Sequence, residues 1–465
     1  MKTKLLFAFL ISLCILLPAV SSAQVIAAGL YHSIAVCSDN TARSWGYNIF
    51  GQLGDGTTTS TLIPVQVNSL TNIISVKCGY KHSLFVKNDG TVWACGDNFY
   101  GQLGDSTVIQ RNTPVQVHLL TDIIAVAGGD GHSIFLKNDG TVWACGDNAN
   151  GELGDGTTTI RHTPVHVNGT TAITAVAGGY EHSIFLKNDS TVWACGFNQY
   201  GQLGNGSTTG SLTPVQVNLL SGIVAVAGGY GFSLFLKNDG TVWACGRNNY
   251  GQLGDGTNID RHTPVQVNPL TGITAVACGR DQSLFVMNNG SAWACGDNTY
   301  GQLGDGTTTG TLTPVQVNSL TNITTVASGV GAYHSLFLKN DNTLWACGYN
   351  TYGQLGDGTN IDKWTPVQVT GLCTVLTGTA EQQWENGFQI YPNPSCGKFS
   401  VEMKRMVKQP QHNISIYDVI GEKVFEQKIV SDKTEINLSE KPSGIYFVQI
   451  ENPNFIESKK LIVAK

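Results

Sequence analysis

The amino-acid sequence predicts an all-β protein, a seven-bladed β-propeller followed by a small β-sandwich C-terminal domain. Three observations support this: seven units spaced close to fifty residues apart, four short apolar runs in each unit, and no window with a helical period. The phrase Gly-Gln-Leu-Gly-Asp-Gly begins at Gly51, Gly251, Gly301 and Gly353, with near-copies from Gly101, Gly151 and Gly201. A unit of this length cannot bury its apolar face by itself, so neighbouring units must cover one another's apolar faces. Because no capping repeat is evident, we expect the array to close into a ring.

Each unit predicts four antiparallel strands joined by turns. In the fourth unit the apolar runs are 172–177, 183–186, 191–195 and 214–217. The Lys-Asn-Asp-Gly phrase between the second and third runs is typical of a hairpin turn. Radial repetition of such four-stranded sheets protects their edges, which is typical of a propeller. We assign residues 24–372 to it.

The two ends of the chain predict export. Residues 1–23 combine Lys2 and Lys4 with an apolar run and end in Ser-Ser-Ala before Gln24, which indicates a cleaved secretory signal peptide. Residues 373–387 form a polar linker. Residues 388–465 contain alternating apolar runs and predict a small antiparallel sandwich.

The repeated motifs resemble a known family. Gly-x-x-His-Ser begins at Gly29, Gly79, Gly129 and Gly179, and Cys-Gly-x-Asn-x-Tyr-Gly-Gln-Leu-Gly begins at Cys95. These motifs resemble the regulator of chromosome condensation repeat family more than kelch units, since a double glycine occurs only in units three to five. The resemblance implies a seven-bladed propeller. One departure is that Cys replaces the family's Trp in all units except the first, which keeps Trp45, and the Trp stands two residues earlier.

The tail also resembles a known domain. Tyr-Pro-Asn-Pro from Tyr391, Ile-Ser-Ile-Tyr-Asp from Ile414 and Ser-Gly-Ile-Tyr-Phe-Val from Ser443 resemble the type A C-terminal sorting domain of the bacterial type IX secretion system. The resemblance implies that the secretion machinery is a partner. It also implies transport across the outer membrane to the cell surface or the medium, with no transmembrane segment in the mature chain.

Charge argues against a nucleic-acid partner. The leader carries two basic residues and no acidic ones, and the tail carries eleven basic and nine acidic residues. The propeller and linker therefore hold fourteen basic and twenty-four acidic residues, whereas a reader of the phosphate backbone needs a basic face.

Twelve cysteines in an exported chain raise the question of disulfides. Six of them recur at one place in successive units, too far apart to pair, and are interpreted as buried thiols: Cys95, Cys145, Cys195, Cys245, Cys295 and Cys347. Cys78 and Cys278 are also expected to be unpaired, and Cys373 with Cys396 is a possible pair. No Cys-x-x-Cys zinc spacing occurs.

The recurrent histidines are interpreted as structural groups that tie a turn to the next blade: His32, His82, His132, His182 and His334. The phrase Asp-Gly-Thr-Asn-Ile-Asp from Asp255 and Asp357 lacks the acidic alternation of a calcium loop. No catalytic set stands apart from the repeat. We therefore predict a protein that is not an enzyme and uses no cofactor or metal.

The repeats differ from one another mainly at one face. The turn between the first two strands and the loop between the last two must emerge together, and both vary, while the Lys-Asn-Asp-Gly turns are nearly constant. Arg and aromatic residues are enriched at binding hot spots. The candidate partner-binding residues are Phe197, Tyr230, Phe232, Arg247, Arg261, His262, Arg280, Asp281, Gln282, Tyr333, Lys363 and Trp364. Arg261, His262, Lys363 and Trp364 are expected at the outer rim.

The function predicted from these observations is a secreted or cell-surface binding propeller that recognises an extracellular protein or glycan through one face. Drift at exposed loops could also produce the differences between units. Two other functions stay open at this point. One is a structural or adhesion element without a discrete site, and the other is an extracellular hydrolase or lyase.

Overall fold

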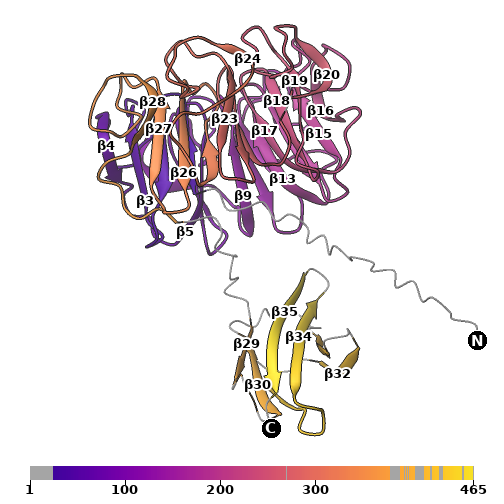
Figure 1. Cartoon of the computed structure of the whole chain (residues 1–465). Helices are drawn as coiled ribbons and strands as arrows, with labels where there is room; N and C mark the ends of the chain where they lie inside the picture. Colours follow the sequence, from indigo (N-terminus) through magenta and orange to yellow (C-terminus); the bar gives the residue numbers. More distant parts are fainter. Residues whose placement is uncertain are drawn as a thin grey trace, which may run out of the picture. The chain divides into compact units, whose positions relative to one another are not determined.

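The computed structural model describes residues 25–268, 270–376, 388–391, 393, 395, 397–403, 413–418, 422–428, 433–452 and 455–463. The described residues form two compact units divided after Thr379 and contain strands but no helix (Figure 1). No helix long and apolar enough to cross a membrane occurs in this part of the chain. The predicted signal peptide lies outside it.

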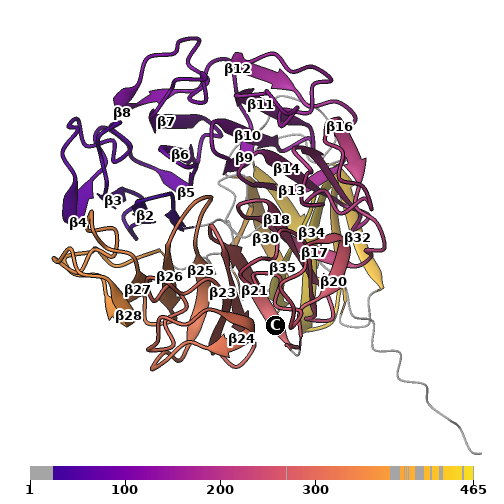
Figure 2. The same ribbon diagram turned by 90° about the horizontal axis from the view of Figure 1, so that it is seen from above.

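The first unit is a ring of seven four-stranded antiparallel sheets, which confirms the predicted propeller (Figure 2). The innermost strands are β1 (Ile26–Ala28), β5 (Ile73–Cys78), β9 (Ile123–Gly128), β13 (Ile173–Gly178), β17 (Ile223–Gly228), β21 (Ile273–Cys278) and β25 (Ile323–Ala327). The second strands are β2 (His32–Val36), β6 (His82–Lys87), β10 (His132–Lys137), β14 (His182–Lys187), β18 (Phe232–Lys237), β22 (Gln282–Met287) and β26 (His334–Lys339).

The third strands are β3 (Ala42–Gly46), β7 (Val92–Gly96), β11 (Val142–Gly146), β15 (Val192–Gly196), β19 (Val242–Gly246), β23 (Ala292–Gly296) and β27 (Leu344–Gly348). The outermost strands are β4 (Thr61–Gln66), β8 (Arg111–Gln116), β12 (Arg161–His166), β16 (Ser211–Gln216), β20 (Arg261–Gln266), β24 (Thr311–Gln316) and β28 (Lys363–Gln368). The order within each blade follows the chain, so every blade is a simple meander.

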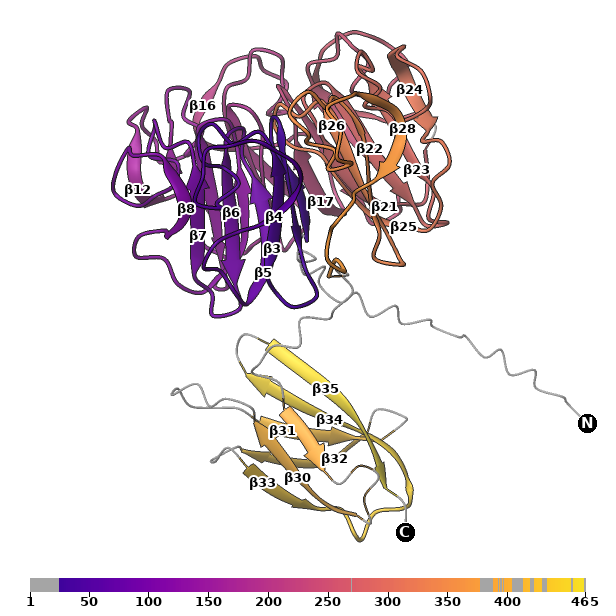
Figure 3. The same ribbon diagram turned by 90° about the vertical axis from the view of Figure 1, so that its left-hand side faces the viewer.

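The second unit contains two sheets (Figure 3). One pairs β29 (Phe388–Tyr391), β30 (Lys398–Met403) and β33 (Lys433–Asn437), and the other pairs β32 (Lys423–Lys428), β31 (Asn413–Tyr417), β34 (Gly444–Asn452) and β35 (Phe455–Val463). Side chains of both sheets share one apolar core, with Phe399 and Ile436 from the first and Ile416 and Val448 from the second. This is the sandwich that the alternating runs predict.

The propeller core lies between neighbouring blades. Leu136 and Val142 of the third blade meet Phe185 and Cys195 of the fourth, and all four side chains are buried. In the fourth blade the thiol Sγ of Cys195 lies 3.5 Å from the carbonyl oxygen of Glu152 in the blade before it. The six recurrent cysteines, together with Cys78 and Cys278, are buried and unpaired, as predicted.

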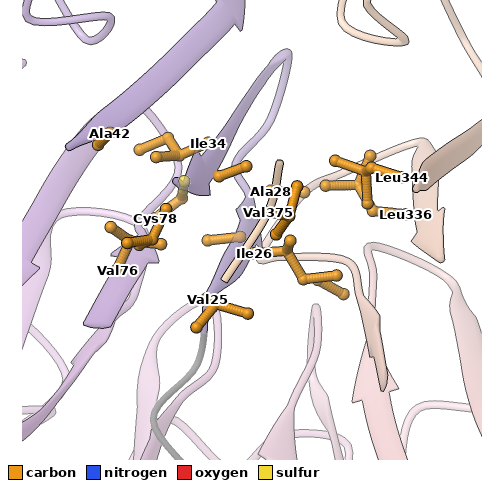
Figure 4. Packing of buried hydrophobic residues seen from close by; sticks show 14 of the residues in the cluster. Val25, Ile26, Ala28, Ile34, Ala42, Val76, Cys78, Leu336, Leu344 and Val375 are labelled. Atoms are coloured by element: carbon orange, nitrogen blue, oxygen red, sulfur yellow. The ribbon is translucent and has the colours of Figure 1, made fainter. Parts of the chain in front are cut away.

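The ring is closed by both ends of the propeller. Val375 forms an antiparallel bridge with Cys37, and the Leu376 amide donates to the Val36 carbonyl oxygen at 2.9 Å. The segment after the seventh blade therefore pairs with the end of β2 along the same edge as β1. Figure 4 shows Val375 packed among Ile26 and Ala28 of the first blade.

A disulfide between Cys37 and Cys373, with Cα atoms 5.7 Å apart, fastens this closure. The structure thus corrects the suggested pairing of Cys373 with Cys396, because Cys373 is already bonded to a residue 336 positions earlier in the sequence. It also shows that residues 373–376, predicted as the start of the linker, belong to the propeller. The pairing with Cys37 could not be found from spacing, since it depends on the two ends of the ring meeting.

The buried histidines bond one blade to the next. The imidazole Nε2 of His32 lies 3.0 Å from the Ser83 hydroxyl, and His82 reaches Ser133 in the same way. His334 lies 2.8 Å from the Ser33 hydroxyl and so joins the seventh blade to the first. This confirms their structural interpretation. The fifth blade carries Phe232, whose side chain has no polar atom for such a bond. In the sixth blade the side-chain amide of Gln282 donates instead to the Ser328 hydroxyl at 3.3 Å and to the Ala332 carbonyl oxygen at 3.0 Å of the seventh blade.

Acid should weaken the propeller through these histidines. Burial lowers the pKa of His32, His82, His182 and His334 to about 3 and that of His132 to about 4. Between about pH 6.5 and 4 the unfolded chain binds protons that the folded chain excludes, so stability falls as pH falls. Each such proton changes the free energy of unfolding by about 1.4 kcal/mol per pH unit.

The measurement is the urea unfolding midpoint between pH 7 and 4. His132→Gln, which copies the residue type found naturally at Gln282, should make the pH slope shallower by about one proton. The raised pKa values of Asp130 and Glu152 oppose the trend, because those groups bind protons in the folded state first. A midpoint that does not fall toward pH 4 would contradict the role given to the histidines.

Candidate binding face

The loops that vary between units lie at one face of the ring. In the third blade His132 pairs with Gly146, and Gly146 pairs with Arg161, so the turn before β10 and the loop between β11 and β12 emerge together. We call the turns between first and second strands the inner turns, and the loops between third and fourth strands the long loops. The end of the ring that carries both is the loop face, and the end with the Lys-Asn-Asp-Gly turns is the link face.

Backbone hydrogen bonds link the inner turns in series from the first blade to the seventh. The Tyr80 amide donates to the Gly129 carbonyl oxygen at 3.0 Å, and the Tyr230 amide donates to that of Arg280 at 3.3 Å. The Arg280 amide continues the series to the Ala332 carbonyl oxygen at 3.0 Å. These bonds between successive blades hold one residue of each inner turn near the axis. It is the residue after the first glycine of the Gly-x-x-His motif, or of its Gly-x-x-Phe and Gly-x-x-Gln variants.

Arg280 is held between aromatic rings in this ring of turns. Its guanidinium carbon lies 4.8 Å from the ring centre of Tyr230 and 5.0 Å from that of Tyr333. The Tyr230 ring in turn lies 4.2 Å from the Tyr180 ring, and Tyr180 lies 5.7 Å from Tyr80. All of these side chains are half-buried, so they keep part of their surface in solvent. A guanidinium over aromatic faces is stabilised by cation–π attraction.

Arg247 and Arg280 share one buried carboxylate. Arg247 Nη1 lies 2.8 Å from Asp281 Oδ1, and Arg280 Nε lies 3.4 Å from Asp281 Oδ2. Burial raises the pKa of Asp281 although both cations oppose the shift. The charge of Asp297 also acts on Asp281, so this part of the loop face holds two cations and two carboxylates.

A second group of tyrosines adjoins the first. Tyr333 lies 5.3 Å from Tyr300, and Tyr300 lies 4.8 Å from Tyr349. The contacts continue from Tyr349 through Tyr31 and Tyr352 to Tyr47, with ring centres 5.4, 5.1 and 4.6 Å apart. Burial, followed by its tyrosine neighbours, raises the pKa of Tyr31 to about 12, so its hydroxyl stays protonated and able to donate.

The structure divides the predicted site residues. Tyr230, Arg247, Arg280 and Tyr333 form the cluster just described. Phe232 and Gln282 are fully buried, and Asp281 is only 4% exposed. This corrects the prediction that Phe232 and Gln282 contact a partner directly, because as the first residues of β18 and β22 they fill the place that the histidines occupy elsewhere.

The residues predicted for the outer rim contact other parts of the propeller. Arg261 pairs with Asp255 at 2.6 Å and Lys363 with Asp357 at 3.4 Å, each within its own blade. His262 and Trp364 are exposed, Trp364 by 54%, and their backbones lie against a glycine of the preceding blade. Phe197 is half-buried with its ring centre 6.1 Å from that of Tyr200.

Several tyrosines near the axis were not predicted, because the prediction rested on differences between units and these residues recur. Tyr80 and Tyr180 occupy the same motif position as Tyr230, and Tyr300 and Tyr352 belong to the recurrent Tyr-Gly-Gln-Leu phrase. Searching for divergence selects against such residues. The position after the first glycine of each Gly-x-x-His motif, which holds Leu30, Tyr80, Asp130, Tyr180, Tyr230 and Arg280 in turn, is the signal that would have found them.

Acidic side chains gather at the same face over the third and fourth blades. Burial raises the pKa of Asp130 to about 6 and that of Glu152 to about 8. Burial, then the charge of Asp147, also raises the pKa of Glu181. Glu152 takes the place of the usual Gln in Gly-Gln-Leu-Gly, and one of its oxygens accepts the Asn150 amide at 2.8 Å.

The net negative charge of the propeller is concentrated on this face. The inner turns and long loops, with the first residues of the outer strands, hold fifteen acidic residues: Asp55, Asp97, Asp105, Asp130, Asp147, Glu152, Asp155, Glu181, Asp255, Asp260, Asp281, Asp297, Asp305, Asp357 and Asp362. They hold seven basic ones: Lys81, Arg111, Arg161, Arg247, Arg261, Arg280 and Lys363. The turns and links of the opposite face hold seven acidic residues and five lysines, so they are close to neutral.

Exposed apolar side chains follow the same distribution. Fifteen large hydrophobic residues in the described part of the propeller are exposed, eight of them in the long loops and five near the start of the outer strands. Of these fifteen, only Leu119 and Leu219 lie on the link face. Among the described residues no group of three or more His, Cys, Asp or Glu side chains could hold a metal ion.

The sequence comparisons agree with this architecture. The RCC1-like domain family matches residues 110–384, more than half of the chain. The chain belongs to this family. Regulator of chromosome condensation repeats match residues 44–86, and also 24–52 and 73–102. A secretion system C-terminal sorting domain matches residues 389–464, which directs the protein through type IX secretion to the cell surface or outside. A comparison with curated proteins found no match.

Solved structures of RCC1-like propellers share the fold. Human WBSCR16 is 24% identical over 70% of this chain and 92% of its own, with a TM-score of 0.64. Prp20p from Saccharomyces cerevisiae, a structure whose description includes binding to Gsp1p and histones, is 22% identical over 78% of this chain and 88% of its own, with a TM-score of 0.62. Yeast RCC1 bound to Kap60 is 20% identical over 84% and 93% of the two chains, with a TM-score of 0.65.

Proposed function

We propose that the mature protein is a non-enzymatic binding module that recognises an extracellular protein or glycan through the loop face. The sorting domain delivers the propeller to the cell surface or outside, where such a partner is met. The observation that carries the proposal is the partly exposed cluster of Arg280, Arg247, Tyr230 and Tyr333 near the axis, in which the Arg280 side chain is 29% exposed and that of Arg247 is 15% exposed.

Three features support the loop face over the link face. Arg and Tyr side chains near the centre of an interface are the residue types that contribute most to binding. The exposed apolar side chains of the propeller lie almost entirely at this end. The link face carries repeated Lys-Asn-Asp-Gly turns whose Asp and Thr side chains bond to each other, as Asp89 and Thr91 do at 2.6 Å, and so serve the hairpin.

The test uses the mature full chain and a partner captured by it from culture medium or environmental glycans. Arg280→Ala and Tyr230→Ala should each weaken binding at least tenfold, since anchors of this kind commonly contribute about 2 kcal/mol or more. Arg280→Ala leaves Arg247 to pair with Asp281, so the melting temperature should stay close to that of the wild type.

Asn88→Ala and Lys87→Ala on the link face are the controls, and binding should change less than twofold. Equal losses from variants of the two faces, or no loss from Arg280→Ala and Tyr230→Ala, would show that the loop face is not the binding surface. Binding would be measured by biolayer interferometry, with thermal unfolding of each variant recorded beside it.

A further inference from the structure

One sector of the loop face combines exposed aromatic rings with carboxylates. Phe99 is 73% exposed, the most exposed aromatic side chain of the propeller, and its ring centre lies 4.9 Å from that of Tyr100. The Tyr100 ring covers Gly131, where a Cβ would lie 2.7 Å from the ring carbon Cδ2. The second blade therefore presents two adjoining rings over the inner turn of the third.

Carboxylates surround these rings. A Cβ at Gly131 would meet the Tyr100 ring and also Asp147, whose own Cβ it would approach to 3.2 Å, and Asp97 Oδ1 accepts the Phe99 amide at 3.2 Å. Burial and then the charges of four acidic side chains raise the pKa of Tyr100: Asp147, Asp130, Asp97 and Glu152. Glu181 belongs to the same group, because its charge raises the pKa of Asp130 and the charge of Asp147 raises the pKa of Glu181. We call Phe99, Tyr100, Asp97, Asp130, Asp147 and Glu181 the acidic sector.

The charges of the acidic sector are poorly balanced from within the protein. Asp281, in the equivalent inner turn of the sixth blade, has two guanidinium partners within 3.4 Å. In the part of the chain that the structure describes, Asp130, Asp147 and Glu181 form no ion pair. Their partners are neutral donors, the Tyr180 side chain for Asp130 and the Asn148 amide at 2.8 Å for Asp147, and Lys81 is the cation whose charge acts on Asp130. Half-buried carboxylates without a paired cation gain from a cation that arrives with a ligand.

We infer that the acidic sector docks a polypeptide segment rich in Lys or Arg. The inference rests on the proposed function, because it identifies the chemistry of the partner that this face receives. A Lys or Arg side chain supplies both parts of the match: its apolar stem covers Phe99, and its cation reaches the carboxylates and the aromatic faces. A neutral glycan would leave the carboxylates unpaired, and an acidic glycan would meet the excess of negative charge on this face.

The net charge of the loop face supports the same partner. Because its excess of acidic residues is not shared by the link face, the field of the propeller draws a cationic segment toward this end. We therefore expect affinity that falls steeply as ionic strength rises, since surface charges are screened by salt.

The test measures binding of a fluorescent polylysine peptide to the mature full chain, with polyglutamate of equal length as the negative control. The triple variant Asp130→Asn, Asp147→Asn and Glu181→Gln should weaken polylysine binding at least tenfold. The matched control, Asp139→Asn, Asp189→Asn and Asp239→Asn on the link face, removes the same number of charges and should change it less than twofold. The control should fold, because Asn289 already forms the same turn in the sixth blade.

Phe99→Ala keeps every charge and removes an exposed ring, and we expect about fivefold weaker binding of polylysine. Equal losses from the two triple variants would show a general charge effect and overturn the inference, as would polyglutamate binding as tightly as polylysine. These results leave the proposed function to its own test, in which Arg280→Ala weakens binding of the captured partner whether or not the acidic sector binds cations.

Discussion

Replacing both Cys37 and Cys373 with Ser should lower the free energy of unfolding of the propeller by about 2–5 kcal/mol. The disulfide joins residues 336 positions apart and holds the segment that pairs with β2, so it restricts the unfolded chain across the whole ring. Urea unfolding monitored by tryptophan fluorescence gives the measurement. The eight buried free cysteines form no disulfide, so neither the double substitution nor a reducing agent breaks a second bond among them.

The control is a reducing agent. It should lower the urea midpoint of the wild type to that of the double Ser variant and leave the variant unchanged. Two backbone hydrogen bonds also join the closing segment to the first blade: Leu376 N–H donates to the Val36 carbonyl oxygen, and Ser38 N–H donates to the Thr374 carbonyl oxygen at 2.8 Å. A variant as stable as the oxidised wild type would show that these bonds hold the ring without the covalent bond.

Trp45→Ala should be the most destabilising single substitution in the first blade, with a loss of about 3–5 kcal/mol. Trp45 is fully buried, and its indole Nε1 donates to the Gln354 carbonyl oxygen at 2.9 Å, so it fills the interface between the seventh blade and the first. The equivalent Cys347 thiol lies 3.5 Å from the carbonyl oxygen of Gln302. The two residue types thus bond to the same backbone group of the preceding blade.

A compensating double variant tests this equivalence. Arg43→Trp with Trp45→Cys copies the arrangement of the other six blades and should recover most of the stability lost in Trp45→Ala, as measured by urea unfolding. A double variant no more stable than Trp45→Ala would mean that the first interface needs the larger side chain at its inner position.

The repeated part of the fold could be predicted from the sequence for a physical reason. Every unit carries the same apolar alternation and turn residues, so the strand order of one blade applies to all seven. The closure could not be predicted from the repeat, because Cys37 replaces the lysine of the first unit's Lys-Asn-Asp-Gly turn, Cys373 follows the last unit, and the two meet only through the geometry of the ring. For the same reason Cys396 looked like the nearer partner.

The candidate site was predicted only in part. Arg247, Arg280 and Tyr333 were found because they differ from their counterparts in other units, whereas Tyr230, which matches Tyr80 and Tyr180, was found because it lies in the same turn as the divergent Phe232. The same criterion selected Phe232 and Gln282, which differ because they fill a buried histidine position between blades. Sequence alone does not separate the exposed residue of a turn from the buried residue that follows it one or two positions later.

The binding face can be tested most directly by hydrogen–deuterium exchange of the mature chain with and without its captured partner. We expect slower exchange of the inner-turn amides at 79–82, 129–132, 179–182, 229–232 and 279–282 when the partner is bound. The hairpin turns at 87–90, 137–140 and 187–190 should exchange at the same rate in both states. Protection of those hairpin turns, or protection confined to residues beyond the propeller, would contradict binding through the loop face.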